Sequence, residues 1–243
     1  MAEEYMLIDT HEVQIWFTDL TLTREQENER FDLLSIEERE RALRFHFPIH
    51  KQRFIAARSM LRSLLGLYLA CAPQDIAFAY DENEKPRLQT SGQMGLQFNL
   101  SHSDHMAVYA FTLHHAVGVD IEKIRDTYNP DVAERYFSRR ENQDLLSLPH
   151  NERTAGFYRI WARKEAIVKA VGKGLTMPLS RFSVSARDIC EDIQLDHDGS
   201  WKLMPLAIHP AFQSAVAASP MIHTLSYWSL FEQHQKLDKV YNL

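Results

Sequence analysis

Two carboxylic acids stand two residues apart in residues 117–122, which read Val-Gly-Val-Asp-Ile-Glu. The aliphatic residues alternate with Gly118, Asp120 and Glu122, so a β-strand here would bury one face and carry both acids on the other. Side chains at positions i and i+2 of a strand lie about 6.6 Å apart, a span that two carboxylates can close around one divalent ion. Because the donors are oxygen atoms, the segment predicts a site for Mg2+ or Mn2+ rather than zinc.

A polar corner precedes these acids along the chain. Residues 99–103 read Asn-Leu-Ser-His-Ser, and one apolar segment at residues 106–112 separates them from the acidic strand. The hydroxyl of Ser101 and the imidazole of His102 can both hydrogen-bond an anion. The alternative to anion binding is that His102 is hydrogen-bonded within this corner and binds no ligand.

A helix supplies the third group of candidate residues. Residues 161–169 read Trp-Ala-Arg-Lys-Glu-Ala-Ile-Val-Lys, and glycines at 172 and 174 end the helical pattern. At about 100° per residue, the apolar side chains from 157 to 171 form one arc with Lys164 near its middle. An unpaired charge in a protein interior is expensive, so we expect the Lys164 ammonium either to reach solvent or to meet an anion.

Glu165 and Lys169 stand four residues apart at the edge of this arc. Taken alone, such a pair is more often an exposed helix salt bridge, worth about 0.2 to 0.5 kcal/mol, than part of an active site. A functional role for these two residues depends on the wider pattern of motifs.

The order of these segments resembles a known family. Together with residues 137–141, Phe-Ser-Arg-Arg-Glu, they look like the signature motifs of the surfactin-type 4'-phosphopantetheinyl transferases, in matching order and spacing. Each motif alone is common, whereas the ordered combination is highly specific. The resemblance covers about residues 30–185 and includes, upstream, Arg41, Arg44, Phe45, Arg53 and the Glu-Lys-Pro run at 84–86.

Two positions depart from the family pattern. Glu38 and Phe54 stand where relatives often place a lysine and a threonine near the 3'-phosphate of coenzyme A. This difference bears on the assignment of Arg41 and Arg53 to that phosphate. The alternative is that both are solvated helix arginines. The metal site is not affected by it.

The resemblance implies a phosphoryl transfer. A serine hydroxyl of an acyl or peptidyl carrier protein attacks the β-phosphate of coenzyme A, takes up 4'-phosphopantetheine and releases 3',5'-ADP. Asp120, Glu122 and Glu165 would hold the metal ion, Mg2+ or Mn2+. Glu165 would complete the metal shell or, through a water, take the serine proton, and Lys169 would neutralise or protonate the departing phosphate.

The resemblance also implies which residues hold the co-substrate and the carrier. The chain has eight glycines but neither a Gly-x-Gly-x-x-Gly run nor a P-loop, so side-chain cations must hold the phosphates. Carrier proteins are usually acidic near the target serine, so Arg139 and Arg140, with Tyr136 and Phe137 beside them, would dock one. The implied coenzyme A contacts are Arg41, Arg44, Arg53, Lys85, Ser101, His102, Lys164 and Lys169.

Composition excludes other classes of protein. With 243 residues, 45% hydrophobic and 25% charged, the chain can bury one large core or two small ones. A formal charge of -6 argues against general nucleic-acid binding, and the longest apolar run, residues 64–72, is too short to span a membrane. The acidic start lacks the basic region of a signal peptide. We therefore expect a cytoplasmic protein, and separately we expect it to be a monomer. Cys71 and Cys190 are expected to be core thiols because no Cys-x-x-Cys is present.

Strands and helices are expected to alternate along the chain. Strands are predicted at residues 12–18, 76–80, 106–112, 181–185, 201–207 and 224–230. Helices are predicted at 35–45, 51–70, 151–171 and, shorter, after Asn129, with capping-box spacings at 35/38 and 138/141. This order indicates an α+β fold. The resemblance adds a pseudo-twofold pair of similar subdomains, residues 1–113 and 114–243, with the site in the cleft between them.

Two functions of other classes use the same residue types. A metal-dependent nucleotide or pyrophosphate hydrolase could use three acids and several cations, but it would need no carrier protein. A non-catalytic coenzyme A or carrier-binding module would be expected to have lost one of Asp120, Glu122 and Glu165, and all three are present. Release of 3',5'-ADP only in the presence of apo-carrier protein separates the transferase from the hydrolase.

Overall fold

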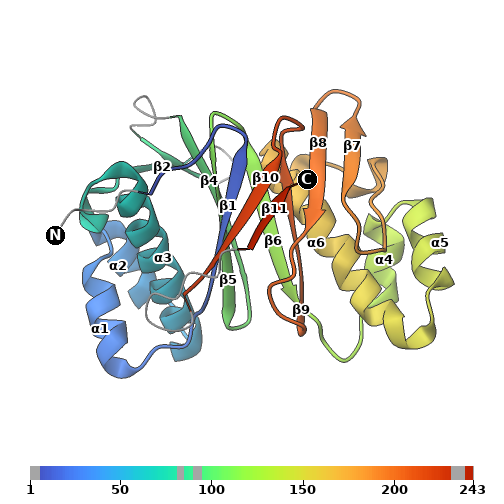
Figure 1. Cartoon of the computed structure of the whole chain (residues 1–243). Helices are drawn as coiled ribbons and strands as arrows, with labels where there is room; N and C mark the ends of the chain where they lie inside the picture. Colours follow the sequence, from blue (N-terminus) through green and yellow to red (C-terminus); the bar gives the residue numbers. More distant parts are fainter. Residues whose placement is uncertain (1–5, 81–84, 90–94, 231–238, 243) are drawn as a thin grey trace.

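The computed structural model describes residues 6–80, 85–89, 95–230 and 239–242, and it has a mixed α+β fold as predicted (Figure 1). None of its helices is long and apolar enough to cross a membrane in the parts described. The helices are α1 (Arg24–Asp32), α2 (Ile36–Leu43), α3 (Pro48–Leu69), α4 (Pro130–Tyr136), α5 (Arg139–Ser147) and α6 (Arg153–Val171). The strands are β1 (Glu12–Asp19), β2 (Phe78–Tyr80), β3 (Pro86–Leu88), β4 (Leu96–Ser103), β5 (Met106–Leu113), β6 (Val117–Lys123), β7 (Glu191–Leu195), β8 (Gly199–Pro205), β9 (Phe212–Ala218), β10 (Thr224–Ser229) and β11 (Lys239–Asn242).

Two larger sheets organise these elements. One sheet has the strand order β11-β10-β1-β5-β4, the other has the order β6-β9-β8-β7, and β2 and β3 form a short separate ladder. In Figure 1, α1 to α3 lie on the outer side of the first sheet and α4 to α6 on the outer side of the second. Each half is thus a sheet covered by helices on one side, which fits the predicted pair of similar α+β subdomains.

Three layers of apolar side chains hold the fold together. The middle layer lies between the two sheets and fully buries Ile15, Val108 and Val119. The second joins the first sheet to α3 through the opposite strand faces, where Tyr109 packs with Leu61. The third joins α6 to the outer face of the second sheet. Because β5 is buried on both faces, its sequence is a nearly continuous apolar run.

The last strands of the chain return to the first sheet. β10 pairs in parallel with β1, with Ile15 opposite Tyr227, and β11 extends the sheet beyond β10. Residues 224–229 and 239–242 therefore lie in the sheet of the N-terminal half, although the predicted boundary assigned them to the C-terminal subdomain. Such long-range pairing leaves no local signal in the sequence. The boundaries 1–113 and 114–243 themselves stay a prediction.

Two local predictions are wrong. Residues 181–185 form no strand, because the chain leaves a short 3-10 turn and then runs extended without a ladder partner, with Phe182 and Val184 packed in the core. The alternation in this segment therefore reflects packing against helices rather than sheet formation. Cys71 and Cys190 are exposed, since both lie in connections outside the regular elements.

An ion pair excluded from solvent joins α5 to α6. Lys164 Nζ lies 2.6 Å from Glu141 Oε1, and both side chains are 0% exposed. The lysine also donates to the Phe182 carbonyl at 2.7 Å, and the glutamate accepts from the backbone nitrogens of Ser138 and Val184. Burial lowers the pKa of the Lys164 ammonium, and the charge of Glu141 opposes this. Of the two alternatives for Lys164, solvent or an anion, the anion is the one observed.

Breaking this pair should destabilise the protein strongly. Lys164→Met or Glu141→Gln alone is expected to lower the free energy of unfolding by about 3 to 5 kcal/mol, because each leaves one buried charge unpaired. The double variant removes both charges and should recover much of the loss. Urea unfolding of the wild type, the single variants and the double variant measures the coupling. Strictly additive losses would contradict it.

Candidate active site

The helix α6 lies directly on β6 because Gly118 has no side chain. A Cβ at Gly118 would stand 2.2 Å from the Ala166 carbonyl oxygen and 2.2 Å from the Ala170 nitrogen. These distances are far below van der Waals contact, so the approach requires glycine. It brings the face of α6 that carries Lys169 over the acidic face of β6, where Lys169 reaches Asp120.

Asp120 is the best-connected acid of the site. Its side chain is 5% exposed, and Oδ1 accepts hydrogen bonds from Lys169 Nζ at 2.6 Å and from Ser101 Oγ at 2.7 Å. The flanking Val119 and Ile121 are buried between the sheets, which confirms the predicted alternation. Among the described residues, Asp120 Oδ2 has no hydrogen-bond partner although it is buried. A buried carboxylate oxygen without a donor is costly, so this atom is available to a further ligand.

Glu122 and Glu165 complete the acidic group, one from β6 and one from α6. Glu122 Oε2 accepts a hydrogen bond from Ser103 Oγ at 3.0 Å. Burial raises the pKa of Glu122 and of Glu165 above their ordinary value, and the charge of Asp120 raises both further. The site therefore concentrates negative charge where water screens it poorly, which favours binding of a cation.

The chemistry of this donor set fits a hard divalent cation. Carboxylate oxygens, one of them buried and orphaned, are the ligands that Mg2+ and Mn2+ prefer. In the conformation described, no group of three or more Asp, Glu, His or Cys side chains converges closely enough to hold an ion, within the residues that the structure covers. The assignment of Asp120, Glu122 and Glu165 as metal ligands stays a prediction.

Lys169 does not form the exposed helix salt bridge that its spacing from Glu165 allows. Its Nζ donates to Asp120, to Ser101 Oγ at 2.8 Å and to the Val119 carbonyl at 3.3 Å. No ion pair joins it to Glu165 in the described part of the chain. The contact with β6 thus replaces the pairing that an isolated helix would favour.

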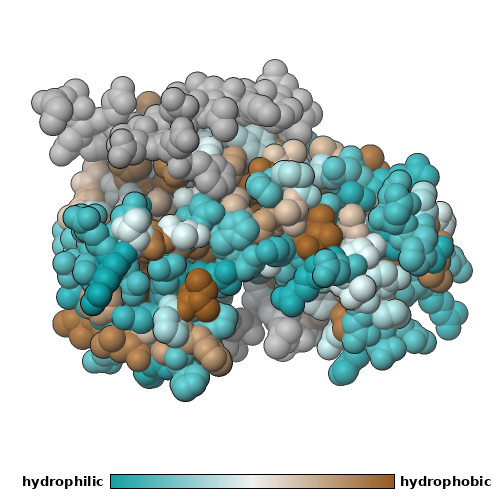
Figure 2. Space-filling view, turned by 90° about the horizontal axis from the view of Figure 1, so that it is seen from below, coloured by the Kyte–Doolittle hydropathy of each residue, from teal (hydrophilic) through white to brown (hydrophobic). Residues whose placement is uncertain are grey.

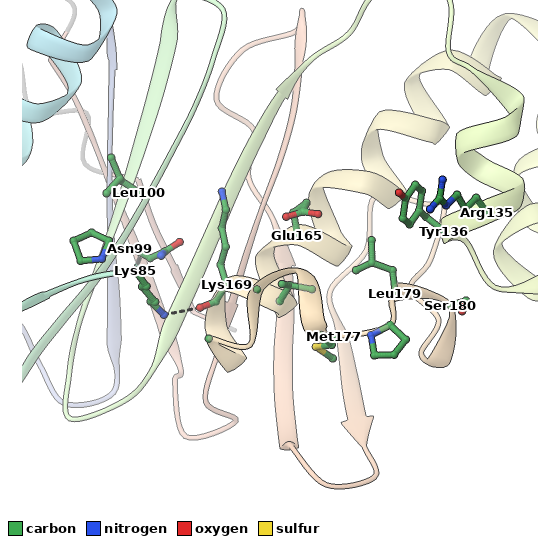
Figure 3. Close-up of a pocket in the computed structure, with 15 residues that line it drawn as sticks. Lys85, Asn99, Leu100, Arg135, Tyr136, Glu165, Lys169, Met177, Leu179 and Ser180 are labelled. Carbon is green, nitrogen blue, oxygen red and sulfur yellow. Dashed lines mark hydrogen bonds between the residues drawn. The ribbon is translucent and has the colours of Figure 1, made fainter. Parts of the chain in front are cut away.

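A first cavity of about 530 Å3 opens beside these acids (Figure 3). In Figure 3, Glu165 and Lys169 on α6 lie in the middle of the lining, between Leu100 on one side and Tyr136 and Leu179 on the other. Lys85 Nζ donates to the Lys169 carbonyl at 2.5 Å, which ties the start of β3 to the last turn of α6. The cavity combines apolar walls with a few charged groups.

A second cavity, of about 720 Å3, lies against α2 and α3. It shares Pro86 and Leu100 with the first cavity, so the two adjoin at these residues. Arginines, a histidine and aromatic rings form much of its lining, namely Arg41, Arg44, Arg58, Arg62, His102, Phe54, Phe78 and Tyr80. Guanidinium groups beside aromatic rings suit a phosphorylated ligand that carries a base.

A third cavity, of about 660 Å3, spans both halves of the chain and shares Arg41, Phe54 and His102 with the second. Asp104, in the left-handed turn between β4 and β5 at φ 51°, accepts a hydrogen bond from Arg53 Nη2 at 2.5 Å and another from Lys123 Nζ. The Lys123 contact, with further help from His105 and Arg53, lowers the pKa of Asp104 well below its usual range. The three cavities adjoin through their shared residues, and we refer to them together as the groove.

The structure brings most of the predicted coenzyme A residues to this groove. Ser101 and Lys164 do not line it: the Ser101 hydroxyl contacts Asp120 and Lys169, and Lys164 is buried in the core. Burial lowers the pKa of His102, and the nearby charges of Lys169 and Arg53 lower it further. The predicted residues that line the groove are Arg41, Arg44, Arg53, Lys85, His102 and Lys169. Their contacts with coenzyme A stay a prediction.

Burial overturns two expected contacts. Lys164 is enclosed with Glu141 in the core, so its ammonium cannot position the pyrophosphate or the pantetheine arm. Phe137 is 3% exposed and packs in the core with α6 residues, so it cannot dock a carrier protein. Arg140 is exposed and lies 3.9 Å from Asp144 on its own helix.

Sequence reasoning missed the buried charges behind the second cavity. Glu38 accepts hydrogen bonds from Arg58 Nε and, at 2.5 Å, from Arg62 Nε, while Arg58 Nη2 donates to the Tyr80 hydroxyl at 2.5 Å. Burial works to raise the pKa of Glu38, but Arg62 and Arg58 outweigh it and the pKa is lowered. Glu38 therefore anchors two arginines. The spacing of those arginines, four residues apart on one helix, was the available signal.

Comparison with known proteins covers both halves of the chain. Residues 12–114 match the family described as 4'-phosphopantetheinyl transferase, N-terminal, and residues 116–212 match the 4'-phosphopantetheinyl transferase superfamily. The 4'-phosphopantetheinyl transferase HetI of Nostoc sp. (strain PCC 7120) is 35% identical over 219 residues, which are 89% of this chain and 92% of the relative. The 4'-phosphopantetheinyl transferase Sfp of Bacillus subtilis (strain 168) is 33% identical over 206 residues, 84% of this chain and 90% of the relative. The chain therefore belongs to the 4'-phosphopantetheinyl transferase superfamily and is an enzyme of the Sfp-like type.

Proposed function

We propose that this enzyme transfers 4'-phosphopantetheine from coenzyme A to a serine of an apo-acyl or apo-peptidyl carrier protein and releases 3',5'-ADP. The observation that carries the proposal is the position of Asp120. Its orphaned Oδ2 lies in an acidic group that Lys169 contacts, and Lys169 and Glu165 both line the groove. Oxygen ligands, a cation for a leaving phosphate and room for a long phosphorylated ligand thus occur together.

The linings of the cavities support one direction for bound coenzyme A. The second cavity, with Arg41, Arg44 and His102, suits the adenine and the 3'-phosphate. The pyrophosphate would then lie near Lys169, and the apolar walls of the first cavity, which include Tyr136, would receive the pantetheine arm. In this placement the base lies against the cationic lining of the second cavity. The pyrophosphate lies near the acidic group, and the thiol arm lies against the apolar lining of the first cavity.

The chain's own residues have distinct parts in the transfer. When bound by Asp120, Glu122 and Glu165, a divalent ion would screen the pyrophosphate charge and orient the β-phosphorus. The serine oxygen forms a bond to that phosphorus, and the bond from phosphorus to the oxygen bridging to the α-phosphate breaks. Lys169 neutralises the charge that develops on the departing 3',5'-ADP. Glu165 has two alternative roles: it completes the metal shell, or it stays off the ion and takes the serine proton through a water. Burial and the charge of Asp120 raise the pKa of the free carboxylate, which suits the second role.

The test is an intact-mass measurement of apo-carrier proteins incubated with enzyme, coenzyme A and Mg2+. Asp120→Ala should reduce the rate of transfer at least about 10²-fold, because it removes a group that stabilises the reacting charges. Asp126→Ala is the matched control, since Asp126 is an exposed acid just beyond the same strand. Near-normal transfer by Asp120→Ala at saturating Mg2+ would remove Asp120 from the mechanism, and release of 3',5'-ADP without carrier would indicate a hydrolase.

Glu165→Gln should raise stability while it lowers activity. The pKa of Glu165 is raised in the folded protein, so its favourable contribution is complete below the ordinary value of 4.5 and is lost as pH rises through the folded pKa. Glutamine does not ionise. Without divalent cations, the melting temperature of the variant should exceed that of the wild type at pH 7, on the order of 2 °C, and the difference should vanish near pH 4.

The control for this experiment is Glu134→Gln, which changes an exposed glutamate on α4. Its melting temperature should follow the wild type at both pH values. Equal melting temperatures for Glu165→Gln and the wild type at pH 7 would show that Glu165 is not held in an unfavourable ionised state.

His102→Ala should weaken binding of coenzyme A more than binding of 3'-dephospho-coenzyme A, by about 1.5 to 3 kcal/mol, if the imidazole donates a charge-assisted hydrogen bond to the 3'-phosphate. Burial lowers the pKa of His102 in the free protein, and an anion would raise it, so affinity should fall as pH rises. Calorimetric titration of both ligands measures the gap. His197→Ala, which changes an exposed histidine between β7 and β8 that lines none of the three cavities, is the control. An equal loss for both ligands in His102→Ala would restrict His102 to supporting the loop.

A further inference from the structure

One carboxylate stands among the cations of the third cavity. The lysine and arginines of its lining are Arg41, Arg53, Lys123 and Arg125. Among the residues that the structure describes, Asp104 is the only acid of the lining. It lies in the turn between β4 and β5, which Figure 1 shows at the lower ends of these strands. Figure 2, seen from that side, shows that hydrophilic residues predominate on this face, so small anions can reach the cations from solvent.

The carboxylate of Asp104 pairs with a cation from each half of the chain. Its Oδ1 accepts a hydrogen bond from Arg53 Nη2 at 2.5 Å, and its Oδ2 accepts one from Lys123 Nζ. These contacts, that of Lys123 first, lower the pKa of Asp104 below its usual range. A lowered carboxyl pKa measures how strongly the surroundings favour a negative charge at that point. The position between Arg53 and Lys123 is thus an anion site that the chain fills with its own side chain.

The turn itself does not require a carboxylate. Asp104 has a φ of 51°, in the left-handed region that glycine and asparagine also adopt readily. Either residue would keep this backbone, but neither carries a charge to meet Arg53 and Lys123. The layer of apolar side chains between the two sheets also holds the halves together without Asp104. The charge of Asp104 therefore serves something other than the formation of the turn.

Removing this charge would leave the third cavity strongly cationic. Arg41 and Arg125 form no ion pair in the part of the chain that the structure describes, and Arg53 and Lys123 pair only with Asp104 there. Without Asp104, four unpaired cations would face one cavity of about 660 Å3. Such a cluster binds phosphate groups of any origin through charge-assisted hydrogen bonds.

We propose that Asp104 is a specificity-determining residue: it fills the anion site between Arg53 and Lys123 and so keeps inorganic phosphate and other small phosphorylated anions out of the third cavity. This cavity shares Arg41 and His102 with the second cavity, so a phosphate ion bound there would compete with coenzyme A. Asp104 lowers the affinity for phosphate as an isolated group and leaves recognition to the larger ligand. The inference rests on the proposed binding of coenzyme A in the groove and adds the residue that excludes other anions.

The first measurement is calorimetric titration of inorganic phosphate into the protein without divalent cations. Asp104→Asn and Asp104→Gly both suit the left-handed turn and remove the charge. Each should bind phosphate at least about tenfold more tightly than the wild type, because Arg53 and Lys123 are then free to donate. Asp198→Asn is the matched control, since the Asp198 side chain is 21% exposed and pairs with Lys173 at 2.6 Å outside the three cavities. Its affinity for phosphate should equal that of the wild type.

A double variant locates the phosphate that the single variants gain. Asp104→Asn combined with Lys123→Gln removes one of the two freed cations and should lose most of the gain in phosphate affinity. An unchanged phosphate affinity in both single variants would overturn the proposal. A gain that the double variant keeps in full would overturn it as well, because phosphate would then bind elsewhere.

Transfer kinetics supply a second readout. Inorganic phosphate should inhibit Asp104→Asn, in competition with coenzyme A, with an inhibition constant about tenfold lower than for the wild type. If Asp104 only joined the two halves, the variant would lose stability and have a raised KM for coenzyme A, with no change in inhibition by phosphate, and the proposal would be wrong. Failure of the wild type to modify any carrier would instead overturn the proposed function, and the phosphate titration would still decide the role of Asp104.

Discussion

The approach of α6 to β6 at Gly118 is the constraint on which the site depends. Because a Cβ there would collide with the backbone of α6, the helix can rest on the strand only where the strand has no side chain. The same strand carries Asp120 on that face, and the helix then buries it. Burial raises the pKa of Glu122 and Glu165, so the folded chain holds acids in an environment that disfavours their charge. The folded state thus carries an energetic cost for its ionised acids, and this cost prepares the site for a cationic ligand.

The two lysines of α6 show that the surroundings of a side chain determine its role. Lys164 and Lys169 are five residues apart, so they point about 140° apart around the helix. Lys164 meets Glu141 inside the core, where the pair holds α5 against α6. Lys169 meets Asp120 at the groove. Residues 137–141 and 161–169 both look catalytic in the sequence, but the two motifs are joined by the buried ion pair of Glu141 and Lys164. Of the two lysines, only Lys169 is accessible to a substrate.

Both halves contribute charged side chains to the groove. The N-terminal half supplies Arg41, Arg44 and His102, and the C-terminal half supplies the acids. Asp104 joins the halves by binding both Arg53 and Lys123. Since the arginines of the second cavity and the acids of β6 and α6 come from different halves, the coupling of a phosphorylated ligand to those acids requires their assembly. A chain of formal charge -6 can thereby bind polyanions through local arrangement rather than overall charge.

The sequence by itself determined the parts whose signals are local. Alternation along residues 117–122 was enough to place Asp120 on the face opposite Val119, and the capping residues Ser35 and Ser138 were enough to locate two helix starts. The order of the motifs was enough to indicate the family. Only the tertiary structure decided which charges meet. The partners of Lys164, Lys169 and Glu38, and the return of β10 to β1, join residues far apart in the chain, and their energies depend on burial that no local pattern encodes.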